Sequence, residues 1–308
     1  MASGWPLMPP YESWSATCDT LHAHTQVLGK LAVAMAPPEP QLQHAALSLT
    51  PRGWETHPLP VHDASGAIVV ALDLRTHEAA VEHSDGRVRR IPLMPDRPVG
   101  EVTAEVLDAV REFGSPALEI NPTPQEVAWT VPLDQDREHA TYDPDQVVAY
   151  FAAATRAALA LAAFRAPYRG RSTPVNAWWG TFDLAVALFS GSPADPPADD
   201  FITRNGGDAE QVEVGWWPGD ARHGNAAFFA FAYPAREGFG GASLSPAMAR
   251  WDDTLAEYLL ESNDLGSSSD PDADAVEFAR SAFRHACTVC EWDPALPASA
   301  DGTPPPVR

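Results

Sequence analysis

The first stretch of the chain alternates apolar and polar residues with a helical period and then becomes continuously apolar. Residues 11–30 predict a helix that ends near Gly29, and residues 31–35 form an apolar run that Pro37 and Pro38 close. A short apolar run bounded by turn residues is typical of a buried strand. We therefore expect a sheet to begin directly after this helix.

Runs of strand length recur downstream, separated by turn residues. They lie at residues 45–49, 67–72, 79–83, 117–120, 184–188, 211–217 and 226–233. The triplet Ser84-Asp85-Gly86 follows one of them and is a hairpin turn signal. Because short strands joined by tight turns pair most simply with their neighbours, we expect antiparallel, meander-like sheets.

Longer segments with helical periodicity alternate with these runs. They cover residues 102–113, 143–164, 248–260 and 273–290. Asp143 supplies an N-cap, and Pro144 is a favoured first-turn residue for the second of these segments. Helices beside antiparallel strands predict an α+β fold, with antiparallel sheets and packed helices.

The second half of the chain repeats the first in outline. Residues 184–188 (Leu-Ala-Val-Ala-Leu) echo residues 31–35 (Leu-Ala-Val-Ala-Met), and each run follows a helix. We expect two similar α/β halves, 1–125 with a helix plus meander and 126–293 with a long helix, Trp-rich strands and terminal helices, within one compact unit. Residues 294–308 predict a disordered tail.

The charge balance argues against several classes of partner. The sequence has 42 acidic and 20 basic residues and a net charge of −22, which repels nucleic acid and anionic membranes alike. The most apolar stretch, 147–166, is interrupted by Arg156 and Arg165, so it predicts a packed helix rather than a membrane span. The first residues lack the features of a secretory signal, and we expect a cytoplasmic protein. The sequence predicts no oligomeric state.

Candidate chemistry is concentrated on one face of the first predicted helix. At about 100° per residue, Asp19, His22, Gln26 and Lys30 fall in one stripe, the polar stripe. Lys30 is the single lysine among the 20 basic residues. A solvent face usually carries Glu, Arg and Lys with freer spacing, so this composition favours the lining of a site, although a solvent face is the alternative.

The stripe offers three catalytic roles. His22 could act as general acid or base, Asp19 could orient its imidazole, and Lys30 could be an electrostatic anchor or an amine nucleophile. Tryptophan pairs at 178–179 and 216–217 lie in predicted strands, where adjacent side chains face opposite sides. One ring of each pair can therefore line a pocket for a small organic ligand, and the alternative is that all four rings form core.

Ordered segments along almost the whole chain resemble a known bacterial family. They include Trp5-Pro6, Trp14, Asp19-Thr20-Leu21-His22, Gln26, Gly29-Lys30, Pro51-Arg52-Gly53-Trp54, Ser84-Asp85-Gly86, the segments 138–144, 179–185, 189–191 and 217–219, and Ala232-Tyr233-Pro234. Together they resemble the domain-of-unknown-function family 5996. The resemblance carries no activity, but it includes His22, Lys30 and Asp183 and so strengthens the stripe as a site. This chain has His24 where the family often has tryptophan and Asn176 where it often has histidine.

Our leading hypothesis is a small-molecule-binding protein, in its catalytic version a metal-independent enzyme that uses His22, Asp19 and Lys30. No cofactor is predicted, and the expected partner is a small organic ligand or substrate. The residues expected to contact it are Trp14, Gln26, His44, His139, Trp178, Trp179, Asp183, Trp216 and Trp217.

Two alternatives remain open. One is a metal-dependent hydrolase or oxygenase in which His22, His44 and His139 join Asp19 or Asp183, because a few histidines and carboxylates can form an open metal site. The other is a non-catalytic binding or interaction protein whose tryptophans are only core.

Overall fold

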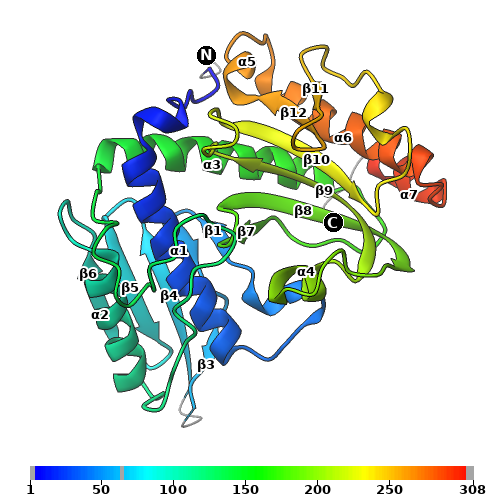
Figure 1. The fold of residues 1–308 in the computed structure, drawn as a ribbon. Helices are drawn as coiled ribbons and strands as arrows, with labels where there is room; N and C mark the ends of the chain where they lie inside the picture. The colour runs from blue at the N-terminus through cyan, green and yellow to red at the C-terminus, as the bar shows by residue number, and fades with distance from the viewer. Residues whose placement is uncertain (1–3, 63–65, 303–308) are drawn as a thin grey trace. The chain divides into compact units, whose positions relative to one another are not determined.

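The computed structural model describes residues 4–62 and 66–302. The chain forms two compact units (Figure 1). Unit 1 comprises Met1–Pro10, Ala152–Asn176 and Leu184–Arg308, and unit 2 comprises Tyr11–Phe151 and Ala177–Asp183. Unit 2 thus extends past residue 125 to Phe151 and also takes in the short segment 177–183.

Unit 2 contains a twisted antiparallel sheet in the order β1-β2-β4-β5-β6, with β3 pairing β4 from the side. Its strands are β1 (Ser48–Thr50), β2 (Gly53–Glu55), β3 (Leu59–Pro60), β4 (Ala67–Asp73), β5 (Glu78–His83) and β6 (Val88–Pro92). The hairpin predicted at Ser84-Asp85-Gly86 joins β5 and β6, and Gly86 has the positive φ of 95° that such a turn requires. The meander is therefore confirmed here.

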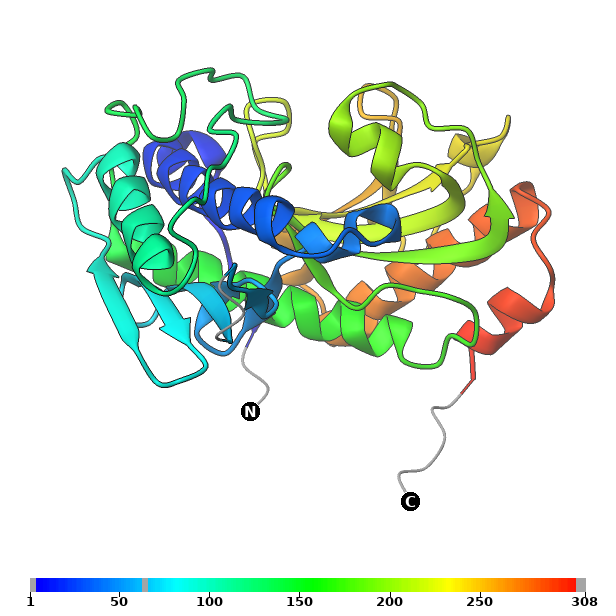
Figure 2. The same ribbon diagram turned by 90° about the horizontal axis from the view of Figure 1, so that it is seen from below.

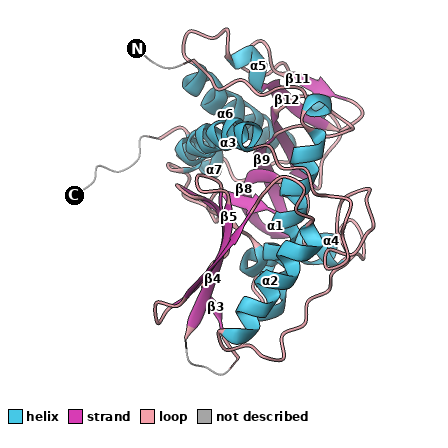
Figure 3. Ribbon diagram, turned by 90° about the vertical axis from the view of Figure 1, so that its left-hand side faces the viewer, coloured by secondary structure: helices cyan, strands magenta, loops and turns pink. Residues whose placement is uncertain are grey.

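Helices α1 (Ser15–Met35) and α2 (Val99–Glu112) lie on the same side of this sheet (Figure 3). The strand alternation explains the arrangement, because Trp54 and its cross-strand partner Leu72 are buried, whereas Glu55 belongs to the other face. Two short 3₁₀ helices, η1 (Tyr11–Ser13) and η2 (Pro40–Ala45), flank α1.

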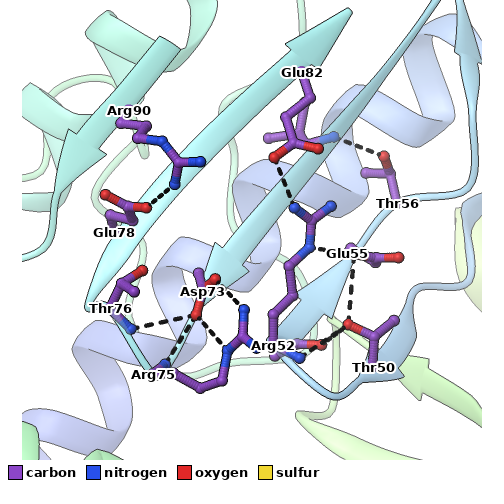
Figure 4. A network of polar contacts seen from close by, with 12 residues as sticks. Thr50, Arg52, Glu55, Thr56, Asp73, Arg75, Thr76, Glu78, Glu82 and Arg90 are labelled. Carbon is purple, nitrogen blue, oxygen red and sulfur yellow. Dashed lines mark hydrogen bonds and ion pairs between the residues drawn. The ribbon is translucent and has the colours of Figure 1, made fainter. Parts of the chain in front are cut away.

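The other face of the unit 2 sheet carries a network of ion pairs (Figure 4). Arg52 bridges two strands, with its Nε atom 2.6 Å from Glu55 and its Nη1 atom 2.8 Å from Glu82. Arg75 pairs with Asp73 at 2.7 Å on the neighbouring β4 end. These arginines are partly exposed, so the pairs contribute modestly to stability and keep this face polar.

The second antiparallel sheet has the order β11-β12-β10-β9-β8-β7, and all of its strands except β7 lie mainly in unit 1. The strands are β7 (Asn176–Trp178), β8 (Asp183–Pro193), β9 (Ala209–Trp217), β10 (Ala227–Tyr233), β11 (Arg250–Asp252) and β12 (Glu257–Glu261). Helix α6 (Pro271–Val289) runs along β9, β10 and β12 (Figure 2). The short helical elements of unit 1 are α4 (Phe201–Gly206), η3 (Phe239–Gly241), α5 (Ser262–Leu265) and α7 (Ala295–Ala300).

The long helix predicted from Asp143 is α3 (Pro144–Arg165). Its buried residues recur at helical spacing, and they include Val147, Tyr150, Ala154, Leu161 and Phe164. Among the described helices it is the one long and apolar enough to cross a membrane, yet a continuous buried stripe is typical of a helix packed in a core.

The α+β fold with two antiparallel sheets is confirmed, and three local predictions were wrong. Residues 31–35 continue α1 instead of forming a strand. The helix ends at Met35, because the next residue, Ala36, precedes a proline and such a residue disfavours helical geometry. Residues 117–120 lie in a loop. Residues 248–260 form the hairpin of β11 and β12, in which Ala256 takes a φ of 57° at the turn.

The predicted tail and the repeated apolar runs also differ from expectation. Part of the tail is helical, since α7 covers Ala295–Ala300, and residues 303–308 lie outside the described residues. The runs at 31–35 and 184–188 take opposite forms, helix and strand. Five small apolar residues therefore carry no repeat of structure here.

Candidate functional site

The polar stripe lies along α1 and is buried with it. His22 is 9% exposed, Gln26 0% and Lys30 4%, and Asp19 is partly exposed near the start of the helix. The alternative of a solvent face is therefore wrong. Sixteen of the 21 residues of α1 are buried, which is the pattern of a central core helix.

Asp19 is held by the tyrosine of η1. The Tyr11 hydroxyl donates to Asp19 Oδ1 at 2.9 Å and lies 3.0 Å from Oδ2. Burial raises the pKa of the Asp19 carboxyl, and the Tyr11 hydrogen bond and the charge of His139 oppose this shift. Among the described residues, the hydrogen bond to Asp19 comes from Tyr11 and not from His22, so the proposed orientation of His22 by Asp19 is wrong.

His22 is oriented by backbone carbonyls of the segment 177–183. Its Nε2–H donates to the carbonyl oxygens of Trp179 and Gly180, at 2.9 and 3.0 Å. The ring stacks on Phe182, with 5.0 Å between centroids and 17° between planes. Two carbonyl acceptors fix the Nε2–H tautomer, so this nitrogen serves to anchor the segment to α1.

Phe182 is the centre of an aromatic stack behind His22. Trp54 and Tyr150 also stack on it, at 5.2 and 5.1 Å, and the Trp54 Nε1–H donates to the Tyr150 hydroxyl at 3.0 Å. Phe182 takes a φ of 59°, which is unfavourable for a bulky residue. Packing on three sides holds it in this conformation, and the strained turn presents the Trp179 and Gly180 carbonyls to His22.

Gln26 fastens the long loop after α2 to α1. Its Nε2–H donates to the Gln125 carbonyl at 2.8 Å, and its Oε1 accepts from the Gln125 N–H at 2.9 Å. A side-chain amide that pairs with both backbone groups of one residue acts as an additional strand-like partner. Gln26 is thus a structural clamp of the loop that carries Trp129 and His139.

Removing this clamp should loosen the loop measurably. We expect Gln26→Ala to lower the free energy of unfolding by about 2 kcal/mol, because two hydrogen bonds at a fully buried side chain are lost. Hydrogen exchange of the Gln125 amide should accelerate in the same variant. Gln135→Ala, at an exposed position of the same loop, is the matched control. Equal exchange at Gln125 in both variants would contradict the clamp.

Lys30 ends the stripe against the face of Trp179. Its Nζ atom lies 5.2 Å from the centre of the Trp179 ring. Burial lowers the pKa of the Lys30 amine to about 8. No carboxylate pairs with it among the residues that the structure describes. The ring itself is held by a hydrogen bond from Trp179 Nε1 to the Ala45 carbonyl, at 3.0 Å.

A carboxylate–imidazole pair that was not predicted from the sequence lies near Asp19, at the end of the stripe opposite Lys30. His139 Nδ1–H donates to Asp136 Oδ2 at 2.7 Å, and we call these two residues the dyad. Asp136 is fully buried, and its Oδ1 also accepts from the backbone N–H groups of Glu138 and His139, at 2.9 and 3.0 Å. The Asp-x-x-His spacing is the sequence signal for this pair, of which the sequence analysis named the histidine alone.

The charges around the dyad favour a protonated imidazole. The hydrogen bond to Asp136 raises the pKa of His139, burial opposes this, and the charges of Asp136 and Asp19 raise it further. Burial acts to raise the pKa of Asp136, but the hydrogen bonds from His139 and from backbone N–H groups outweigh it, so the net pKa is lowered. Trp129 lies beside His139, 4.8 Å between ring centroids, and its edge also approaches His22 at 5.8 Å.

The other predicted contact residues divide between the two units. In unit 2, Trp14 stacks on Tyr150, His44 Nδ1 accepts from the Glu39 N–H, Trp178 is partly exposed, and Thr181 donates to Asp183. In unit 1, Trp216 donates to Ser262 at 2.8 Å and Trp217 packs on Phe229. Both unit 1 rings are built into the core of the sheet.

The histidines named for a metal site have separate partners. His22 bonds carbonyl groups, His44 a backbone N–H, and His139 a carboxylate. Within residues 4–62 and 66–302, no three side chains of His, Cys, Asp or Glu are grouped as a metal would require. Cys18, Cys287 and Cys290 are buried and form no disulfide. The ligand set proposed from the sequence is therefore not assembled.

Comparison with known families places the chain. A family model described as "Family of unknown function (DUF5996)" matches residues 5–298. The chain belongs to this family. No curated protein and no solved structure matches it. Three of the segments that suggested the family contact one another in unit 2, since His22 bonds the Trp179 carbonyl and Gly29 and Lys30 both adjoin the Trp179 ring.

Proposed function

We propose that this member of DUF5996 binds a small organic molecule beside the dyad and exchanges a proton with it through His139. The observation that carries the proposal is the hydrogen bond from His139 Nδ1 to the fully buried Asp136. A buried carboxylate fixes the tautomer and the plane of an imidazole and stabilises its cation. Such pairs serve general acid–base chemistry.

The second nitrogen of His139 is the reactive atom of the proposal. Among the described residues, Nε2 makes no hydrogen bond, and the side chain keeps 14% of its surface exposed. Because Nδ1 is committed to Asp136, a proton can be gained or lost only at Nε2. Trp129 supplies an aromatic wall beside the ring, which suits the apolar part of an organic ligand.

Asp19, which is held by the Tyr11 hydroxyl, is a second carboxylate that acts on the dyad. The charge of Asp19 raises the pKa of His139, and that of His139 opposes the rise in the Asp19 pKa. A cationic imidazole between two carboxylates would bind a ligand carboxylate or phenolate at Nε2, and a neutral imidazole would accept a proton. His22 and Gln26 position the covering segments rather than react.

The proposal predicts an ordered change of the His139 pKa. We expect Asp136→Asn to lower it most, because the hydrogen-bonded carboxylate is lost, and Asp19→Asn to lower it less, because only a charge is lost. Titration of the His139 Cε1–H signal by NMR measures both shifts. Glu138→Gln, which removes an exposed charge near the ring, is the control and should shift the pKa least. A His139 pKa that is equal in wild type and Asp136→Asn would overturn the role of the dyad.

Binding is tested with a fragment library of small carboxylic acids, phenols and amines observed by NMR. Fragments that perturb Trp129 should lose affinity at least tenfold in His139→Gln, and anionic fragments should weaken as the pH rises through the raised His139 pKa. His223→Gln is the matched control, because His223 also faces a carboxylate, Glu261 at 3.0 Å, and a tryptophan, in unit 1. Perturbations that persist in His139→Gln, or no binding by any fragment, would sink the proposal.

A further inference from the structure

Lys30 is a buried amine that has no paired carboxylate among the described residues. The side chain is 4% exposed, and the Trp179 ring lies under its Nζ atom at 5.2 Å. A buried ammonium without a paired carboxylate loses most of its hydration, and one aromatic face replaces little of it. The surroundings therefore favour the neutral amine more than water does. All the other residues in the Lys and Arg count are arginines, and a guanidinium group cannot supply a neutral amine.

The surroundings are built to keep this geometry. Gly29 leaves no side chain between the helix and the Trp179 ring, since a Cβ atom there would lie 2.1 Å from the ring. Trp179 Nε1 is tied to the Ala45 carbonyl, and the backbone carbonyl of Trp179 is tied to His22. The ring, which is 3% exposed, is therefore a fixed apolar wall beside the amine.

We propose that Lys30 is a carbonyl-reactive amine that condenses with an aldehyde of an aromatic or otherwise apolar small molecule to form an imine. The Nζ lone pair attacks the carbonyl carbon of the aldehyde. The nitrogen gives up two protons to the carbonyl oxygen, and this oxygen leaves as one molecule of water while the C=N bond forms. No oxidant or reductant takes part. Protonation of the imine restores a cation over the Trp179 face.

This inference does not rest on the proposed function of the dyad. It concerns a different group at the other end of α1, and either can fail alone. Its chemistry follows from three features on one site: a neutral-capable amine, an apolar aromatic wall and the lack of a paired acid among the described residues. The lowered pKa of Lys30, about 8, agrees with the geometry.

A single lysine makes the test clean, because the chain has one other kind of amine, its α-amino group. The full-length protein is treated with benzaldehyde and sodium cyanoborohydride near neutral pH, and the reduced adducts are located by peptide mass spectrometry. The α-amino group is the internal control for reagent activity. The same reaction in urea gives the rate for an exposed lysine with an ordinary pKa.

We expect native Lys30 to be modified at least about tenfold faster than Lys30 in the unfolded chain, because a larger fraction of the amine is neutral at this pH. Its rate should saturate with benzaldehyde concentration, whereas that of the α-amino group should rise linearly. Trp179→Phe should keep saturation, and Trp179→Leu should weaken it. Native Lys30 that reacts no faster than the unfolded control, or without saturation, would overturn the inference, and Lys30→Arg should show adducts only at the α-amino group.

Discussion

Replacing Gly29 with alanine should lower the free energy of unfolding by about 2 to 3 kcal/mol, although alanine is the better helix former. A Cβ atom at this position would lie 2.1 Å from Cγ and Cδ2 of Trp179, far inside van der Waals contact. The ring cannot retreat easily, because it is 3% exposed and its Nε1–H is bonded to Ala45. Overpacking of this kind outweighs the roughly 1 kcal/mol that alanine gains over glycine inside a helix.

The measurement is urea unfolding followed by circular dichroism. Gly206→Ala is the matched control, since Gly206 also lies in a helix, α4, but nothing within 4 Å would meet its Cβ atom. That variant should be neutral or slightly more stable. A stability of Gly29→Ala equal to that of the control would show that the Trp179 ring is free to move.

Acidification should weaken the protein through His24, a histidine of α1 that is 2% exposed. Burial lowers the pKa of His24 to about 4, and the charge of Asp136 only partly opposes this. The Nδ1 atom is buried without a partner among the described residues. Because the folded state binds fewer protons than the unfolded state between pH 4 and 6.5, stability falls as the pH drops through this window, by about 3 kcal/mol in total.

A difference measurement isolates this effect. Burial also raises the pKa of Glu257 to about 7, and that group acts in the opposite sense, losing stability as the pH rises. The free energy of unfolding is therefore compared between wild type and His24→Phe at each pH. The advantage of His24→Phe should grow by about 3 kcal/mol from pH 6.5 to pH 4. A constant difference across this range would mean that His24 is not held neutral by the fold.

Local patterns predicted the elements whose ends are marked by the chain itself. The turn at Ser84-Asp85-Gly86 and the cap at Asp143 with Pro144 are such marks, and the hairpin of β5 and β6 and the helix α3 follow them. The run at 31–35 has no such mark at its start. Gly29 reads as a helix stop, but its lack of a side chain serves the packing of Trp179, which is remote in sequence. Tertiary contact decided that boundary, and no local rule contains it.

The sequence predicted that the polar stripe shares one helix face, but it did not predict the partners of the stripe residues. Helical spacing alone put Asp19, His22, Gln26 and Lys30 on one stripe, and α1 buries most of it. Their partners come from elsewhere: Trp179 and its neighbours hold His22 and Lys30, and Gln125 holds Gln26. Since these partners are about a hundred or more residues away along the chain, only the fold can reveal them. The pair of Asp136 and His139 is local, and its spacing left a signal in the sequence.

The seven residues 177–183 also constrain how the protein can be made and rearranged. Unit 2 lacks the ring beside Gly29, the acceptors for His22 and the centre of its aromatic stack until this segment has been synthesised. On the ribosome, unit 2 therefore cannot complete its folding when Phe151 emerges. Nascent chains that end before residue 183 should remain sensitive to protease. For the same reason, neither unit can be exchanged between genes as one continuous stretch of coding sequence.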